Sequence, residues 1–233
     1  HGWSDAAQDY RKEARGALMA FNYETGFIDN GIVLERKGCA QYRFDFHGVG
    51  AHAGNNPEDG RSAVKELCHK ALDMEALTDM AEGTTVNVGV IAGGTVPNAI
   101  PENAWCRVDV RFRTMAGIER VEKALKEITD KVYIDQVQTT CRCEVKMGAM
   151  ERLASSEALF DKANQIAREA GLPEMKAIAV GGGSDSAYIT AEGVPALCAM
   201  GVKGQFNHTV REWAEESSLT ERAKLSAALL MKL

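Results

Sequence analysis

The feature that most constrains this chain is a repeated change of hydrophobic period between residues 40 and 147. Apolar and polar residues alternate, as in strands with one buried face, in four segments: 40–47, 86–90, 106–112 and 141–147. Two intervening segments, 64–72 and 118–128, place apolar residues at helical spacing instead. The order strand, helix, strand, strand, helix, strand predicts a ferredoxin-like open-faced sandwich over about residues 38–149.

This topology predicts which loops lie together. A right-handed crossover makes the first two strands parallel, so the loop 48–59 and the hairpin 93–103 are expected at the same end of the sheet. His52 lies in the first of these among small residues, and Asn98 lies in the second. An imidazole and a carboxamide at one end could donate hydrogen bonds to a carbonyl or a carboxylate. The alternative for Asn98 is an asparagine that only forms a turn.

The flanks have a different pattern. Before the sandwich we expect a helix over 4–19 and a short strand at 21–26. After it we expect elements typical of an α/β domain: a helix at 156–170, strands at 176–180 and 195–200, and a last helix that begins with a capping box at 218–221. Residues 1–37 and 150–233 are therefore predicted to form one α/β domain, interrupted by the sandwich. It offers only about three strands, so we expect its neighbouring strands to come from sequence before His1.

Composition excludes several classes of function. The formal net charge is −6 and there is no basic stripe, which argues against a nucleic-acid partner. No apolar run approaches the ~20 residues of a membrane-spanning helix. Six cysteines without a Cys-x-x-Cys pair favour a reducing compartment, so a cytoplasmic location is expected. Because the first residue is His1 and not Met, we also expect that the true N-terminus lies outside this sequence. Cys141 and Cys143 alternate along a strand, and we interpret them as core thiols rather than as a metal pair.

Two candidate metal ligands lie in the flanks. Glu24 ends a strand, and His208 lies in a polar loop after another, so both are expected at the edge of the α/β sheet. Each could equally be a solvated loop residue. Two ligands also fall short of the three or four that a zinc site needs.

Two further candidates could bind an anion. Arg111 lies on the polar face of the third sandwich strand, where it is either solvent-exposed or a bidentate partner for a carboxylate. The turn formed by Gly181, Gly182 and Gly183 could cradle an anion at a helix N-terminus, although it lacks the lysine of a P-loop. Asp185, which follows the turn, is interpreted as a helix cap.

Taken together, these segments resemble the dinuclear-zinc aminoacylase and carboxypeptidase family, which includes glutamate carboxypeptidase, acetylornithine deacetylase and succinyl-diaminopimelate desuccinylase. The motifs that carry the resemblance occur in the family's order across nearly the whole chain: Phe21–Gly26, Gly48–Gly54 with Pro57 and Gly60, Gly93–Pro101, Asp109–Arg111, Gly181–Asp185 and Asn207–His208. The resemblance implies an α/β zinc domain with an inserted ferredoxin-like dimerisation (lid) domain. It also implies a homodimer that hydrolyses an amide or peptide bond of an N-acyl or peptidyl amino acid.

The resemblance also implies roles for individual residues. Glu24 and His208 would each bind one of two zinc ions, for which manganese or cobalt could substitute. His52 would reach across the dimer and stabilise the oxyanion in the partner's site. The substrate's carboxylate would be held by Asn98 and Arg111, and the pocket would be lined by Gly181, Gly182 and Gly183.

The family's remaining ligands, a His-x-Asp motif, a bridging Asp and a Glu-Glu pair, have no counterpart in this sequence. We therefore expect the chain to correspond to about the C-terminal 60% of such an enzyme, and to be inactive alone. The alternative from another class is a non-enzymatic dimerisation or small-molecule-binding module.

Overall fold

The computed structural model describes residues 6–233, with side chains from residue 8 onward. The chain divides into two compact units, one formed by residues 38–147 and the other by the two flanks, which end at Lys37 and resume at Gly148. The second boundary predicted from the sequence lies two residues later. The catalytic and lid roles expected for these units remain predictions.

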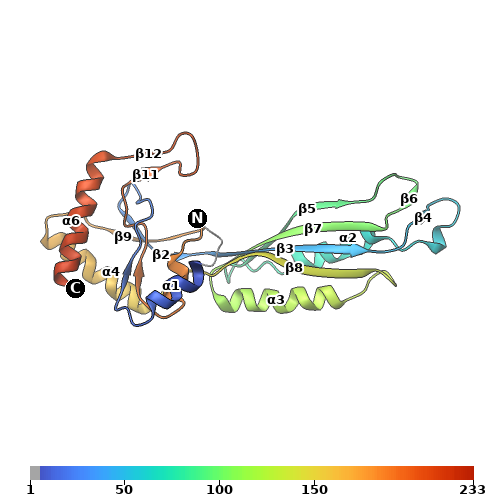
Figure 1. The fold of residues 1–233 in the computed structure, drawn as a ribbon, viewed down its shortest axis with the longest axis horizontal. Coiled ribbons are helices and arrows are strands. Elements are labelled where there is room, and N and C mark those ends of the chain that lie inside the picture. Colours follow the sequence, from blue (N-terminus) through green and yellow to red (C-terminus); the bar gives the residue numbers. More distant parts are fainter. Residues whose placement is uncertain (1–5) are drawn as a thin grey trace. The chain divides into compact units, whose positions relative to one another are not determined.

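The unit of residues 38–147 is a four-stranded antiparallel sheet with two helices (Figure 1). Its elements are β3 (Gly38–His47), α2 (Ala63–Glu75), β5 (Thr85–Gly93), β7 (Asn103–Phe112), α3 (Met115–Asp130) and β8 (Gln138–Met147). The strand order is β5-β7-β3-β8, and β3 and β5 are both antiparallel to β7, so they run parallel to each other. The predicted ferredoxin-like topology is confirmed.

Strict alternation fixes the faces of this sheet. In β3 and β7 the apolar positions are buried, and Phe44, Phe112 and Ile118 of α3 are fully enclosed. Each helix begins at a hydroxyl cap, because Ser62 accepts a hydrogen bond from the amide of Lys65 and Thr114 accepts one from the amide of Gly117.

The opposite face of the sheet is charged. Arg43, Asp45 and Arg142 form a chain of ion pairs there, and the Arg43 guanidinium stacks on the Trp105 ring with its carbon 4.3 Å from the ring centroid.

The expectation that Cys141 and Cys143 are core thiols is wrong. Both cysteines are exposed. They pair across the ladder with Phe44 and Tyr42, so they do face the helix-covered side of the sheet. Because β8 is an outer strand, however, nothing covers their free flank.

The flanking unit contains shorter strands. Its elements before β3 and after β8 are α1 (Ala6–Ala14), β1 (Ala20–Phe21), β2 (Gly31–Arg36), α4 (Ala154–Glu169), β9 (Lys176–Val180), α5 (Ser186–Thr190), β10 (Ala196–Leu197), β11 (Gly204–Gln205), β12 (Trp213–Ala214) and α6 (Glu216–Lys232). β1 pairs in parallel with β10, and β2 pairs in parallel with β9. A bridge between Val33 and Cys198 links the two pairs. Apolar side chains of β2, α4 and α6 form the core, including Ile32, Phe160 and Leu225.

Several sequence predictions need correction here. The first helix is shorter than 4–19: it ends at Ala14, before Gly16 in the left-handed region at φ +85°, and residues 4 and 5 lie outside the described part. The strands expected at 21–26 and 195–200 shrink to two residues each, whereas β2 was not predicted.

The last helix begins at Glu216, not at a capping box on Ser218. The Ser218 hydroxyl instead donates to the carbonyl of Glu215 and accepts from the amide of Lys203. Within residues 6–233, no helix combines the length and the apolar character needed to cross a membrane.

Candidate functional site

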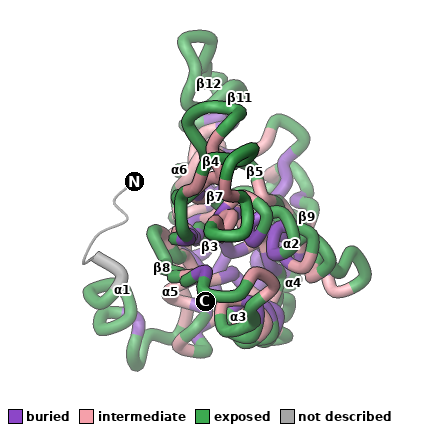
Figure 2. Tube along the Cα trace, turned by 90° about the vertical axis from the view of Figure 1, so that its right-hand side faces the viewer, coloured by how far each residue is buried: buried purple, intermediate pink, exposed green. Residues whose placement is uncertain are grey.

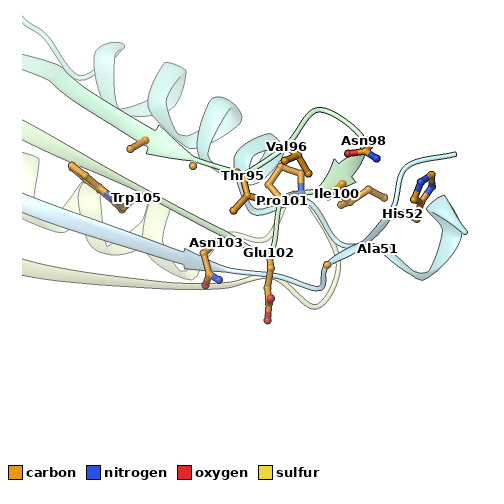
Figure 3. Close-up of a pocket in the computed structure, with 15 residues that line it drawn as sticks. Ala51, His52, Thr95, Val96, Asn98, Ile100, Pro101, Glu102, Asn103 and Trp105 are labelled. Atoms are coloured by element: carbon orange, nitrogen blue, oxygen red, sulfur yellow. The ribbon is translucent and has the colours of Figure 1, made fainter. Parts of the chain in front are cut away.

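A pocket of about 720 Å³ lies at one end of the sandwich, and we call it the tip pocket (Figure 3). It is bounded by the short strand β4 (Ala51–His52), the short strand β6 (Ala99–Ile100) and the ends of β5 and β7. Its walls combine apolar and polar side chains: Val96, Ile100, Pro101 and Trp105 with His52, Thr95, Asn98, Glu102 and Asn103. The mixture of apolar walls and a few polar groups is typical of sites for small organic ligands.

The two predicted polar residues meet at this tip. β4 and β6 pair in antiparallel register, with His52 opposite Ala99, and the amide of Ala53 donates to the carbonyl of Asn98 at 2.9 Å. The structure therefore confirms that the loops after the first and second sandwich strands lie at the same end. Both residues are exposed. In Figure 2 the tube near the label β4 is coloured mainly as exposed, whereas buried residues gather near the label β3.

The hydrogen bonds of His52 define what its imidazole can do. Its Nδ1 accepts hydrogen bonds from the amides of Gly54 and Asn55, each at 3.1 Å. An imidazole nitrogen that accepts from two amides carries no proton, so the proton of the neutral ring is on Nε2. The turn therefore presents Nε2–H as a fixed donor at the exposed tip.

Glycines allow the chain to close tightly behind His52. A Cβ at Gly48 would lie 2.0 Å from the carbonyl oxygen of Arg61, and Val49 and Arg61 exchange two backbone hydrogen bonds at 2.9 and 2.8 Å. A side chain at position 48 would separate these segments. At Gly50 the nearest atom would be 3.7 Å away, so that position has room.

Arg111 does not join His52 and Asn98 within one chain. It lies near the end of β7, eight residues beyond Asn103, which corresponds to roughly 26 Å along the strand. Its guanidinium forms two hydrogen bonds with the Asp109 carboxylate, at 2.8 and 3.2 Å, and these bonds raise the pKa of Arg111.

The flanking unit contains a second candidate site around Glu24. The guanidinium of Arg36 donates through Nη2 to Oε2 of Glu24 at 2.9 Å and through Nη1 to the carbonyl of Gly182 at 3.1 Å. Arg36 is only 7% exposed. One buried side chain thus joins the predicted carboxylate ligand to the predicted glycine turn, and it leaves Oε1 of Glu24 outside this ion pair.

Backbone hydrogen bonds place the segment that precedes His208 beside the segment of Glu24. The amide of Gly201 donates to the carbonyl of Glu24 at 2.9 Å, and the amide of Gly204 donates to the carbonyl of Gly26 at 3.0 Å. Segment 24–26 therefore runs beside segment 201–204, and His208 follows four residues later in an exposed loop, with φ +66°. That its imidazole meets Glu24 at a cation stays a prediction.

The chemistry of this donor set suits a divalent cation, because carboxylate oxygen and imidazole nitrogen are ordinary zinc ligands. In the part of the chain that the structure describes, however, no group of three or more His, Cys, Asp or Glu side chains could hold a metal ion. Glu24 and His208 therefore fit such a site only as two members of a larger set.

Sequence reasoning missed two residues near Glu24. Asp185 was interpreted as a helix cap, but its side chain makes no capping hydrogen bond. Burial raises the pKa of its carboxyl, and the negative charge of Glu24 raises it further. Arg36 was assigned no role. A basic residue at the end of an apolar run could have been noticed, but its partners were not visible in the sequence.

Comparisons with known proteins agree with this architecture. Residues 34–137 match the family described as "Peptidase dimerisation domain". Carboxypeptidase G2 from Pseudomonas sp. (strain RS-16) is 27% identical over 225 residues, covering 96% of this chain and 54% of that protein. The indole-3-acetyl-aspartic acid hydrolase of Enterobacter agglomerans is 41% identical over 78 residues, covering 32% of this chain and 18% of that protein.

Solved structures show the same fold. The aminopeptidase PepT from Bacillus cereus ATCC 10987 matches with a TM-score of 0.75 and 21% identity, covering 96% of this chain and 61% of that one. The match to the family described as "Peptidase dimerisation domain" covers most of the unit of residues 38–147. The sequence matches confirm the resemblance to the peptidase and aminoacylase family that the sequence motifs indicated. The chain spans about half the length of carboxypeptidase G2.

Proposed function

We propose that this chain supplies the C-terminal part of a metal-dependent hydrolase that cleaves an amide bond of an N-acyl or peptidyl amino acid. The observation that carries the proposal is the imidazole of His52, whose Nδ1 is occupied by two amides and whose Nε2–H is free to donate from the tip. A fixed donor of this kind stabilises the oxyanion that forms when an amide carbonyl is attacked. The names of the relatives, a carboxypeptidase and an indole-3-acetyl-aspartic acid hydrolase, support the reaction class.

The other residues have binding roles in this proposal. Oε1 of Glu24 and the imidazole of His208 would hold metal, zinc in the first instance, with manganese and cobalt as alternatives. The chemistry that such a metal would supply is Lewis acidity, which would lower the pKa of a water molecule for attack on the amide. Asn98 and Arg111 would hold the substrate's carboxylate. Asn98 and Arg111 lie far apart within the same compact unit, so this role requires the two residues to come from different copies of the chain. The substrate-binding pocket of the hydrolase would be lined by Gly181, Gly182 and Gly183.

A second copy is proposed to pair along β5. This outer strand contains no charged residue and exposes Val90 and Ile91 at 46% and 54%. The other outer strand, β8, carries Arg142, Glu144 and Lys146. Charges protect an open edge from pairing, whereas an uncharged β-branched edge can extend into a second sheet. A symmetric antiparallel β5–β5 contact would give the homodimer that the domain's description suggests.

The dimer can be tested by sedimentation at several concentrations. Val90→Lys is expected to give a monomer, and Thr140→Lys on the outer strand β8 is the matched control that should leave the dimer intact. A wild-type chain that remains monomeric at high concentration would refute the β5 contact.

The hydrolase is tested by the coding sequence upstream of His1. A His-x-Asp motif and a Glu-Glu pair there would support the enzyme, whereas a start codon at or near His1 would favour a non-enzymatic dimerisation or small-molecule-binding module. In the longer protein, His52→Gln is expected to lower kcat about 10²–10³-fold with KM little changed. His69→Gln, which replaces an exposed histidine on α2 of the same unit, is the control.

The 233-residue chain alone is expected to show no amide hydrolysis with added zinc, because it provides two of the expected ligands. Hydrolysis by the purified chain would contradict this.

A further inference from the structure

A second cluster of reactive side chains lies between α3 and the outer strand β8, in a pocket of about 350 Å³ that we call the dithiol pocket. Its lining consists of Tyr42, Glu122, Leu125, Lys126, Thr129, Cys141 and Cys143. The two cysteines are two residues apart and pair with Phe44 and Tyr42, ahead of the register shift between Tyr42 and Gln41, so their thiols project from the same side of β8.

These thiols differ from the other cysteines of the chain. Cys39, Cys106 and Cys198 are buried, and Cys68 is exposed on α2. Cys141 and Cys143 are both exposed and share one pocket.

The other potential ligand in the pocket is already engaged. Oε1 of Glu122 accepts hydrogen bonds from the Tyr42 hydroxyl and from Nζ of Lys146, both at 2.7 Å. The described residues also provide no cluster of three or more ligating side chains. A cation bound here would therefore have two sulfur ligands, which suits a soft ion that accepts in-line coordination and does not suit tetrahedral zinc.

We propose that Cys141 and Cys143 form a binding site for a soft monovalent metal cation such as Cu(I). The cation is held between the two thiolates. Along one face of a strand the Cα atoms of residues two apart are about 6.6–6.8 Å from each other. Two metal–sulfur bonds of about 2.3 Å span about 4.6 Å. Rotation about the Cα–Cβ bonds, toward the open flank of β8, brings the sulfur atoms to that separation.

Binding is an exchange of protons for metal. Although both residues are exposed overall, partial burial of their thiol groups raises the pKa of Cys141 to about 11 and also raises the pKa of Cys143, so both groups are thiols near neutral pH. Two S–H bonds break, two sulfur–copper bonds form, two protons pass to solvent, and the oxidation state of copper does not change. The complex carries one net negative charge. The ammonium group of Lys146 favours the thiolate of Cys143, while its partner Glu122 opposes it.

The proposal is tested on the purified chain by anaerobic competition for Cu(I) against bicinchoninate. The wild type is expected to take one equivalent, and Cys141→Ser and Cys143→Ser are each expected to weaken binding at least tenfold. Cys68→Ser is the matched control and should bind as the wild type does. Circular dichroism establishes that each variant is folded. The affinity should rise by up to about a hundredfold per pH unit below the thiol pKa values, because two protons leave.

Equal Cu(I) uptake by wild type and by the Cys141→Ser/Cys143→Ser double variant would overturn the assignment. A loss of the same size in Cys68→Ser would also overturn it, because uptake would then not depend on the pair.

Discussion

Replacement of Lys70 by methionine is expected to destabilise the sandwich strongly. Lys70 and Glu66 lie one turn apart on α2, and their side chains are 1% and 0% exposed. Nζ of Lys70 contacts Glu66 Oε1 at 3.2 Å and donates to the carbonyl of Thr129 at 2.9 Å. The same carboxylate accepts hydrogen bonds from the amides of Tyr133 and Ile134. The pair therefore ties the loop after α3 to α2.

The magnitude follows from the charge that the substitution leaves behind. Without the ammonium group, Glu66 keeps two amide donors but has no counter-charge at a position without solvent, and the loss of one partner of a buried pair costs about 3–5 kcal/mol. Lys65→Met removes an exposed lysine from the same helix and should change stability by less than about 0.5 kcal/mol.

Urea denaturation followed by circular dichroism measures these changes. The double variant Glu66→Gln/Lys70→Met should be more stable than Lys70→Met alone, because it removes the uncompensated charge and keeps an acceptor for the loop amides. A cost below about 1 kcal/mol for Lys70→Met, or a double variant less stable than the single one, would refute the reasoning.

Three further outcomes are expected. Hydrogen bonds from Arg43 lower the pKa of Asp45 in the folded state despite partial burial. The stability that Asp45 contributes is therefore present above the pKa of the unfolded state and is lost as the pH falls through the pKa of the folded state. The difference in urea midpoint between wild type and Asp45→Asn should shrink below about pH 4. Gly48→Ala should cost about 1–3 kcal/mol because its Cβ would meet a backbone carbonyl, whereas Gly50→Ala should stay within about 0.5 kcal/mol in the same assay. Arg36→Met should speed amide exchange in the glycine turn 181–183 about tenfold, since the turn loses a buried donor equivalent to about 1.4 kcal/mol.

Half of the fold could be predicted from pattern alone. The alternation in β3 and β7 is strict because one face of the sheet is packed and the other is charged, and right-handed crossover then brings His52 and Asn98 to one end. Strand β2 was missed because Ile32 and Leu34, like the intervening residue, are buried, and a run buried on both faces has no period.

The parts of the sites that could not be predicted depend on distant partners. Arg36 is buried because it pairs with Glu24 and with a carbonyl 146 residues further along the chain, and no local pattern encodes that distance. The exposure of Cys141 depends on β8 being an outer strand, which is a property of strand order and not of the residues themselves. The proposed meeting of Glu24 with His208 stays a prediction.

The two-residue ladder between β4 and β6 determines the orientation of the catalytic candidate. Neighbouring residues of a strand point to opposite faces, so a slip of one position in this ladder would turn the imidazole of His52 to the other side and place Ala51 or Ala53 where it had been. A single inserted residue between Ala53 and Asn98 that displaced the pairing would therefore invert the direction of the donor, while every chemical group remained present.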